Sequence, residues 1–226
     1  TDLDNFNSTW NIFADYVQPF SDSGKLEAGY KSIIREIDLD HLWYDLSSGS
    51  EILLTGRNYR YIYNEQIHAI YGVLSDAVKK INYELGLRLE QVFTNSQEDS
   101  SHYSFENNYF RIYPSLKLGY TFSETHQLLF SYSGRVNRPD FEQLNLIPKF
   151  VDPLNLEAGN PELDPEYVHS FELGYKKQWD IGYLQVAGFY KNIRKPIFET
   201  ITVDTSGVAT YTPQNFEKGY NGGAEI

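Results

Sequence analysis

"INYELGLRLEQVF", residues 81–93, is the clearest indication of the fold, because its side chains alternate between apolar and polar along the whole stretch. Apolar residues stand at every second position from Ile81 to Phe93, with Gln91 as the one interruption. The positions between them hold Asn82, Glu84, Gly86, Arg88 and Glu90. A period of two predicts a β-strand with one apolar and one polar face. Ordinary strands have about 5 to 6 residues, so this unusually long apolar face needs an equally long covering.

The same alternation recurs along the chain and predicts about nine strands with no helix. One face of the 25–46 stretch, for example, holds Leu26, Ala28, Tyr30 and Ile34. The facing of the last two strands stays open. Besides 81–93, the predicted strands cover 8–19, 25–46, 58–75, 104–122, 127–137, 166–179, 182–198 and 209–226.

The connections between these strands alternate between short and long. The short ones, at 21–24, 75–80, 123–126 and 180–182, are rich in Ser, Asp and Gly. The long ones fall at 45–58, 96–105, 138–165 and 199–208. Transmembrane barrels have short periplasmic turns, long extracellular loops and strands that are apolar outside and polar inside. The pattern predicts an all-β fold, an antiparallel up-and-down transmembrane β-barrel segment whose apolar face meets lipid and whose charged face lines a wet interior.

Aromatic side chains, 16% of the chain, gather at the strand ends. Tyr120, Phe122, Tyr175 and Trp179 precede short turns, whereas Tyr59, Tyr61 and Tyr63 follow a long connection. These are the two heights at which the aromatic girdles of a membrane barrel lie. A soluble sandwich or propeller with tyrosine-rich outer faces is the alternative, but it favours shorter strands and more even loops.

Composition and motifs argue against enzymatic chemistry and against nucleic acid as a partner. The net charge of −12 disfavours a polyanion, and the absence of cysteine removes thiolate and disulfide chemistry. The five histidines, His41, His68, His102, His126 and His169, have no metal-binding spacing, and no nucleotide or hydrolase fingerprint occurs. We therefore expect no catalytic residue, no metal site and no cofactor. Calcium binding is an alternative for the acidic residues of the long connections, but their spacing matches no calcium loop and favours solvated charge. These residues are Asp38, Asp40, Asp45, Glu98, Asp99, Asp152, Glu157, Glu162 and Asp164.

The run from 134 to 176 carries the most specific signal. It joins "NRP" at a strand end, "LNL", and "DPLNLEAGNPELDPE" before the next strand, and "FYKNIRKPI" follows at 189–197. This run resembles the outer-membrane β-barrel region of TonB-dependent receptors, in the family with an N-terminal carboxypeptidase-regulatory-like module. Leu146 stands where that family usually has proline. We interpret the motif as structural, because prolines end strand ladders and Gly-Asn-Pro forms turns. Its residues are Arg138, Pro139, Leu144, Asn145, Gly159, Asn160, Pro161, Pro165 and Glu166.

The resemblance implies active uptake across the bacterial outer membrane. Such barrels have about 22 strands around a plug, so residues 1–226 are expected to be a partial barrel domain without the plug and the remaining strands. The implied partners are outer-membrane lipid, the TonB complex acting through the plug and a nutrient, with a surface lipoprotein as a further candidate. The simplest interpretation of the charged residues on the polar strand faces is that they keep the barrel interior hydrated. For the ligand path through the interior, we name Arg60, His68, Arg88, Arg111 and Arg135, together with 140–165.

Three hypotheses follow from the sequence. The first is a receptor that imports a siderophore, haem, a glycan or a peptide, and the sequence does not choose among these substrates. The second is a structural or adhesion barrel in the outer membrane without transport. The third is a soluble, tyrosine-rich carbohydrate-binding β domain, because exposed tyrosines stack on sugars.

Overall fold

The computed structural model describes residues 2–42, 44–45, 50–53, 58–99, 103–145, 149–152 and 154–226. Nine strands form the main sheet: β1 (Asp2–Pro19), β2 (Lys25–Leu42), β5 (Tyr59–Val78), β6 (Ile81–Glu98), β7 (Tyr103–Ser123), β8 (His126–Asn137), β11 (Glu166–Trp179), β12 (Gly182–Arg194) and β15 (Lys218–Glu225). The shorter elements are β3 (Tyr44–Asp45), β4 (Ile52–Leu53), α1 (Phe141–Leu144), β9 (Lys149–Asp152), β10 (Asn155–Glu157), β13 (Ile197–Val203) and β14 (Ala209–Asn215).

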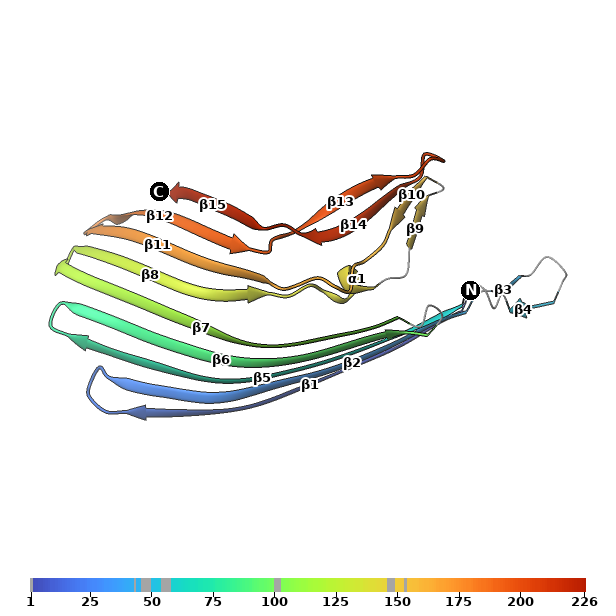
Figure 1. The fold of residues 1–226 in the computed structure, drawn as a ribbon. Helices are drawn as coiled ribbons and strands as arrows, with labels where there is room; N and C mark the ends of the chain where they lie inside the picture. Colours follow the sequence, from blue (N-terminus) through green and yellow to red (C-terminus); the bar gives the residue numbers. More distant parts are fainter. Residues whose placement is uncertain are drawn as a thin grey trace.

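The main sheet is antiparallel and follows the chain up and down, in the order β1-β2-β5-β6-β7-β8-β11-β12-β15 (Figure 1). Every strand pairs with the long strands before and after it in the sequence, so β1 and β15 form the two edges. This confirms the predicted fold class of long antiparallel strands connected up and down. A tilted strand crosses a membrane with about 9–11 residues. The strands β1 to β7 of this sheet have 18 to 21 residues, and therefore extend well beyond that length.

The short connections all lie at one end of the sheet, at the left of Figure 1. The turn predicted at 75–80 is shorter than expected, because β5 continues to Val78 and only two residues separate it from β6. Lys79, the first of them, has φ 55°, a left-handed conformation that suits a tight hairpin turn.

Cross-strand partners lie on the same face of a sheet, so the register divides the residues into two faces. Leu85 is paired with Leu74 on β5 and Leu116 on β7, and Glu84 with Ser75 and Lys117. We call the face that carries Leu85 the apolar face and the face that carries Glu84 the polar face. Large side chains on the apolar face are exposed, including Trp10 at 67% and Ile112 at 55%. So wide an exposed apolar surface marks contact with another phase or partner.

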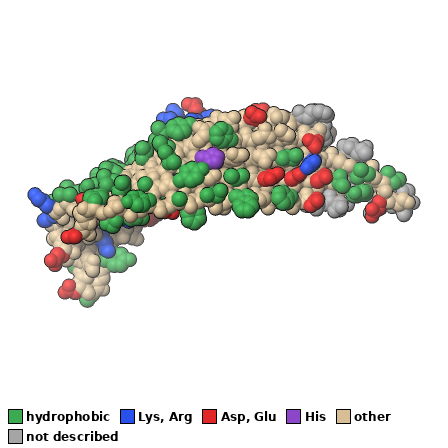
Figure 2. All heavy atoms as spheres, turned by 90° about the horizontal axis from the view of Figure 1, so that it is seen from below, with side chains coloured by type: hydrophobic (Ala, Val, Ile, Leu, Met, Phe, Trp, Pro, Cys, Tyr) green, Lys and Arg blue, Asp and Glu red, His purple; other side chains and the backbone are tan. Residues whose placement is uncertain are grey.

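Figure 2 shows one side of the molecule, with hydrophobic side chains spread over the strands, acidic side chains toward the end with the long connections, and further acidic side chains at the end with the short turns. Within the described ranges, no helix has both the length and the apolar character needed to cross a membrane.

The long connections contain structure that the sequence pattern did not predict. β13, β14, β10 and β9 form a second, four-stranded sheet in that order, at the upper right of Figure 1. The strand predicted at 182–198 therefore ends at Arg194, and the one predicted at 209–226 is divided into β14 and β15. Likewise, the strand predicted at 25–46 ends at Leu42, and β3 and β4 form a separate small hairpin. The expectation of no helix was wrong for the four residues of α1.

Candidate functional site

The sheet register places the five predicted path residues on two different faces. Arg88 and Glu90 alternate with the apolar residues of β6, and Arg111 is paired with Glu90, so both arginines lie on the polar face. Arg135 joins them, because it lies two residues beyond Ser133, the partner of Ser115 on that face. His68 is paired with Gln91 and Ser32, between apolar-face neighbours, and Arg60 has the same parity. The prediction that Arg60 and His68 line the interior was therefore wrong.

The reason lies in β5, where the usual chemical contrast between the two faces is reversed. Its tyrosines point to the polar face, with Tyr61 fully buried and Tyr63 at 3% exposure. These two side chains are therefore not part of an aromatic girdle. His68 instead accepts or donates hydrogen bonds with Tyr30 and Ser32 of β2, at 3.0 Å and 3.1 Å. Arg60 forms an ion pair with Asp38.

The connection between β8 and β11 covers the tyrosines of β5. Leu144 and Leu163 of this connection form a buried cluster with Ile37, Leu39, Tyr61 and Tyr63 on the polar face of β2 and β5. The hydroxyl of Tyr61 donates a hydrogen bond to the carbonyl of Leu144 at 3.2 Å. Because β6 and β7 separate β5 from β8 in the sheet, this connection reaches across the polar face, and we call its described residues, 138–145, 149–152 and 154–165, the strap.

The motif residues shape this strap. Asp140 caps α1, its side chain accepting from the Gln143 backbone N–H, and the Gln143 side chain accepts from the Asp140 N–H in return. The backbone N–H of Gly159 donates to the carbonyl of Asn145 at 2.9 Å, and that of Asn160 to Gln143 at 2.6 Å. A Cβ at Gly159 would lie 2.4 Å from the Asn145 carbonyl oxygen, so only glycine permits this approach. Pro161 and Pro165 are buried, whereas Leu146 lies outside the described residues.

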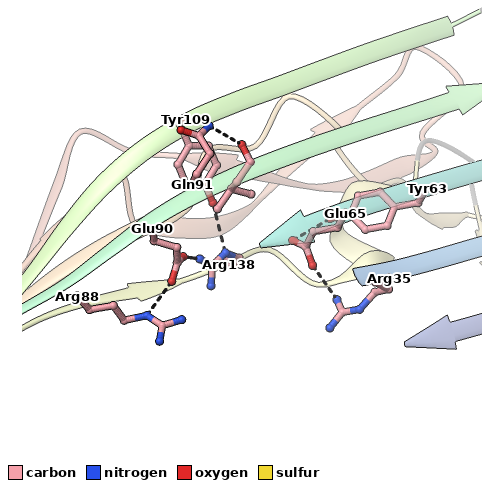
Figure 3. Close-up of polar contacts among 9 residues, drawn as sticks. Arg35, Tyr63, Glu65, Arg88, Glu90, Gln91, Tyr109 and Arg138 are labelled. Carbon is pink, nitrogen blue, oxygen red and sulfur yellow. Dashed lines mark hydrogen bonds and ion pairs between the residues drawn. The ribbon is translucent and has the colours of Figure 1, made fainter. Parts of the chain in front are cut away.

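Charged groups meet under the strap in two sets (Figure 3). Glu90 has 2% exposure, contacts the guanidinium of Arg138, and accepts from Arg88 Nε at 2.9 Å. Arg138 Nε also donates to the Tyr109 hydroxyl at 3.3 Å. A buried carboxylate needs such compensation, because an unpaired charge is very costly away from water. The pair therefore fastens the first residue of the strap to β6.

In the second set, Oε2 of Glu65 lies 3.5 Å from Nη1 of Arg35. Oε1 of Glu65 accepts a hydrogen bond from the Tyr63 hydroxyl at 3.3 Å. Burial lowers the pKa of the Arg138 guanidinium, and the nearby Glu65 carboxylate acts in the opposite direction. Sequence reasoning missed Glu65 altogether. The one sequence signal for Glu65 is its spacing, because it follows Tyr63 by two residues and so lies on the same face as the tyrosines of β5.

The strap is joined to the connection between β12 and β15. β10 pairs in parallel with β14, and Lys195 forms an ion pair with Asp164. Asn215 accepts from the Asp164 backbone N–H at 2.8 Å and donates to the Asp164 carbonyl at 2.9 Å. The two connections thus form one assembly at the end of the sheet opposite the short turns.

The four described histidines and the loop residue Asp152 have partners within the protein. Each of the four described histidines contacts a tyrosine of a neighbouring strand, in the pairs His41–Tyr59, His68–Tyr30, His126–Tyr175 and His169–Tyr132. His102 lies outside the described residues. The Asp152 carboxylate accepts from Asn155 and from the Leu154 backbone N–H, and these hydrogen bonds lower its pKa. Among the described residues, no group of three acidic or histidine side chains is placed to hold a metal ion.

Comparison with known proteins agrees with this architecture. The profile of the outer membrane protein β-barrel family matches residues 1–226. The fold is similar to that of the copper transporter OprC, with a TM-score of 0.71 and 13% identity over 98% of this chain and 35% of OprC. It is also similar to the ferric citrate transporter FecA, with a TM-score of 0.61 and 16% identity over 98% of this chain and 32% of FecA.

A third similar structure is the haemophore receptor HasR of Serratia marcescens, with a TM-score of 0.60 and 13% identity over 97% of this chain and 45% of HasR. The chain thus spans between 32% and 45% of the length of these three proteins. The expected resemblance to the barrel region of TonB-dependent receptors is confirmed at the level of the fold. No curated protein matches the sequence.

Proposed function

Because the chain belongs to the outer membrane protein β-barrel family, we propose that it forms part of the wall of a TonB-dependent receptor that takes up a nutrient across the bacterial outer membrane. The outer-membrane location explains the apolar face, since lipid covers what water would leave exposed. An outer-membrane location is also incompatible with the third hypothesis, a soluble carbohydrate-binding domain.

The observation that carries the proposal is the strap, which folds onto the polar face and is held there by the Arg138–Glu90 pair. An inward-folded connection narrows the passage through a barrel at the end where the long loops lie, which is extracellular in such barrels. Charged and tyrosine side chains then line a hydrated wall past which a solute moves without covalent chemistry. Residues 1–226 serve in this proposal as a partial barrel domain.

The remaining parts of the proposal concern partners. The proposed receptor acts with a plug inside the barrel, on which the TonB complex acts, and a surface lipoprotein is a further partner. The similar structures support uptake of scarce metals or metal complexes, since they include a copper transporter and a ferric citrate transporter. Glycans and peptides stay among the proposed nutrients.

Growth of a deletion strain tests the uptake proposal. The strain and its parent are grown with limiting iron–siderophore complex, haem, copper, glycan or peptide as the single source of the nutrient in question. We expect a defect on one of these sources, restored by the intact gene, and the same defect when the TonB complex is inactivated. Equal growth on every source would favour the structural or adhesion barrel instead.

A further inference from the structure

The ladder between β7 and β8 opens partway along the two strands. Its last pair is Ser115 with Ser133, although β7 extends back to Tyr103 and β8 continues to Asn137. Pro114 stands at the point of separation and has no N–H to donate to a ladder. A pocket of about 670 Å³ lies beside this opening, lined by β7, β8, β11 and the base of the β12–β15 connection.

The lining of this pocket is strongly basic. It includes five cationic side chains, and Glu217 is the one acidic residue among the residues that line it. The five are Arg111, Arg135, Arg194, Lys195 and Lys218. Lys195 is paired with Asp164, and Lys218 lies 3.8 Å from Glu217, so the three arginines supply the positive charge of the pocket that no carboxylate neutralises, in a chain whose net charge is −12. A recessed surface with one sign of charge attracts ligands of the opposite sign.

Two arginines of the pocket, Arg111 and Arg135, lie on the polar face, whereas Arg194 is paired with Tyr167 and has the parity of the apolar face. All three differ in their partners from the arginines near the strap. Arg88 and Arg138 share the buried Glu90, and Arg35 is paired with Glu65. Over the described ranges, by contrast, Arg111, Arg135 and Arg194 form no ion pair with a carboxylate.

Arg111 is held in place without a carboxylate. Its guanidinium lies 5.7 Å from the Tyr109 ring centroid and 5.0 Å from that of Tyr167, and its Nη1 donates to the Phe110 carbonyl at 3.0 Å. Aromatic contacts of this kind orient a guanidinium while leaving some of its five donors available. The side chain is therefore positioned with its charge unneutralised.

We propose that this pocket binds a solute carrying two or more carboxylate or phosphate groups. Guanidinium groups recognise both oxyanions through paired N–H donors, and Tyr113, Tyr167 and Phe216 of the lining add apolar contact. As an account of the imported nutrient, the inference rests on the proposed uptake function. As an account of a binding site, it stands on the pocket alone.

Calorimetric titration of the complete protein, purified from outer membranes in detergent, tests this site. Citrate serves as the polycarboxylate probe and inositol hexakisphosphate as the polyphosphate probe, each at low and high salt. The test variant carries Arg111→Gln and Arg135→Gln. The matched control carries Lys117→Gln and Lys176→Gln, which remove the same charge from polar-face positions nearer the short turns. The heat-dependent shift of the folded barrel on electrophoresis verifies folding of each variant.

We expect at least one probe to bind, more weakly at high salt, and the arginine variant to lose about tenfold in affinity for each arginine. The lysine control should bind like the unaltered protein. Absence of binding by both probes, or an equal loss in the lysine control, would overturn the inference. Which probe binds tells the polycarboxylate and polyphosphate classes apart.

The outcome is independent of the uptake test. If the arginine variant supports normal growth on the imported nutrient while the probes do not bind, the anion site is wrong and the uptake proposal stands. If the probes bind as expected but the deletion strain grows normally on every source, the site stands and the uptake proposal falls.

Discussion

At the scale of single residues, Glu90 and Glu84 form a natural pair for comparison. Both lie on the polar face of β6, and both form ion pairs with basic side chains. Glu90 has 2% exposure, whereas the side chain of Glu84 has 40%. Removing one partner of a buried ion pair costs about 3–5 kcal/mol, while an exposed pair contributes about 0–1 kcal/mol. The same chemical change should therefore have very different effects at the two sites.

We predict that Glu90→Gln lowers the free energy of unfolding by about 3 kcal/mol or more, because Arg88 and Arg138 lose their shared carboxylate. Denaturant-induced unfolding of the purified protein in detergent, followed by tryptophan fluorescence, measures the change. Glu84→Gln is the control and should shift the free energy by about 1 kcal/mol or less. Similar effects of both substitutions would show that the Glu90–Arg138 contact does not fasten the strap.

Gly159 offers a second residue-scale prediction, this time about backbone packing. Alanine at this position would place its Cβ 2.4 Å from the Asn145 carbonyl oxygen and 2.7 Å from the Asn145 nitrogen. We expect Gly159→Ala to loosen the strap, so that protease added to intact cells cleaves within 138–165 several times faster than in the unaltered protein. Gly182→Ala is the control, because no atom of the described residues lies within 4 Å of a Cβ there. Unchanged cleavage in Gly159→Ala would contradict the described contact.

At the scale of elements, the main sheet followed from the sequence and the second sheet did not. Long strands with period two and alternating connections predicted the up-and-down order, because lipid and water impose their contrast on every crossing. β9, β10, β13 and β14 do not belong to the main sheet and pair with one another in a separate four-stranded sheet, so the contrast between lipid and water does not set their pattern. Their pairing is between connections far apart in the chain, as in β10 with β14, and no local pattern encodes it.

The candidate site was predicted in the same uneven way. Arg88, Arg111 and Arg135 were placed on the correct face by counting along strands of clear alternation. Arg60 and His68 were misplaced, because the strap buries the tyrosines of β5 and so makes its polar-face positions look apolar. Their role in a ligand path is withdrawn, whereas that of the three arginines stays a prediction.

The pairing of β10 with β14 is testable because the chain has no cysteine of its own. Asn155 and Ala209 are partners in the parallel register. We predict that Asn155→Cys with Ala209→Cys forms a disulfide in intact cells treated with a mild oxidant, detected as altered migration that reductant reverses. Asn155→Cys with Thr212→Cys is out of register by three residues and should stay reduced. Crosslinking in the second pair alone would show a different register.

At the scale of the whole molecule, the distinction between the two faces is an environmental one. The apolar face is covered by lipid, and the polar face looks into the interior together with the strap. Consecutive residues of a strand face different environments, because adjacent side chains point in opposite directions. Phe130 and Ser131 of β8 show this well. Phe130 is paired with Leu118 and Leu173, and Ser131 with Lys117 and Glu172.

Arginine substituted at these two adjacent positions should therefore report the environment of each face at almost the same depth. Phe130→Arg places a charge in lipid, which costs about 2–4 kcal/mol near the middle of the bilayer. Ser131→Arg places the same charge beside Glu172 on the hydrated side, where it should change stability little. We predict that the amount of heat-modifiable, folded protein in the outer membrane falls severalfold for Phe130→Arg and stays close to the unaltered level for Ser131→Arg. Equal losses would mean that the polar face is packed against a dry surface, and the reverse order would mean that the sheet faces the opposite way.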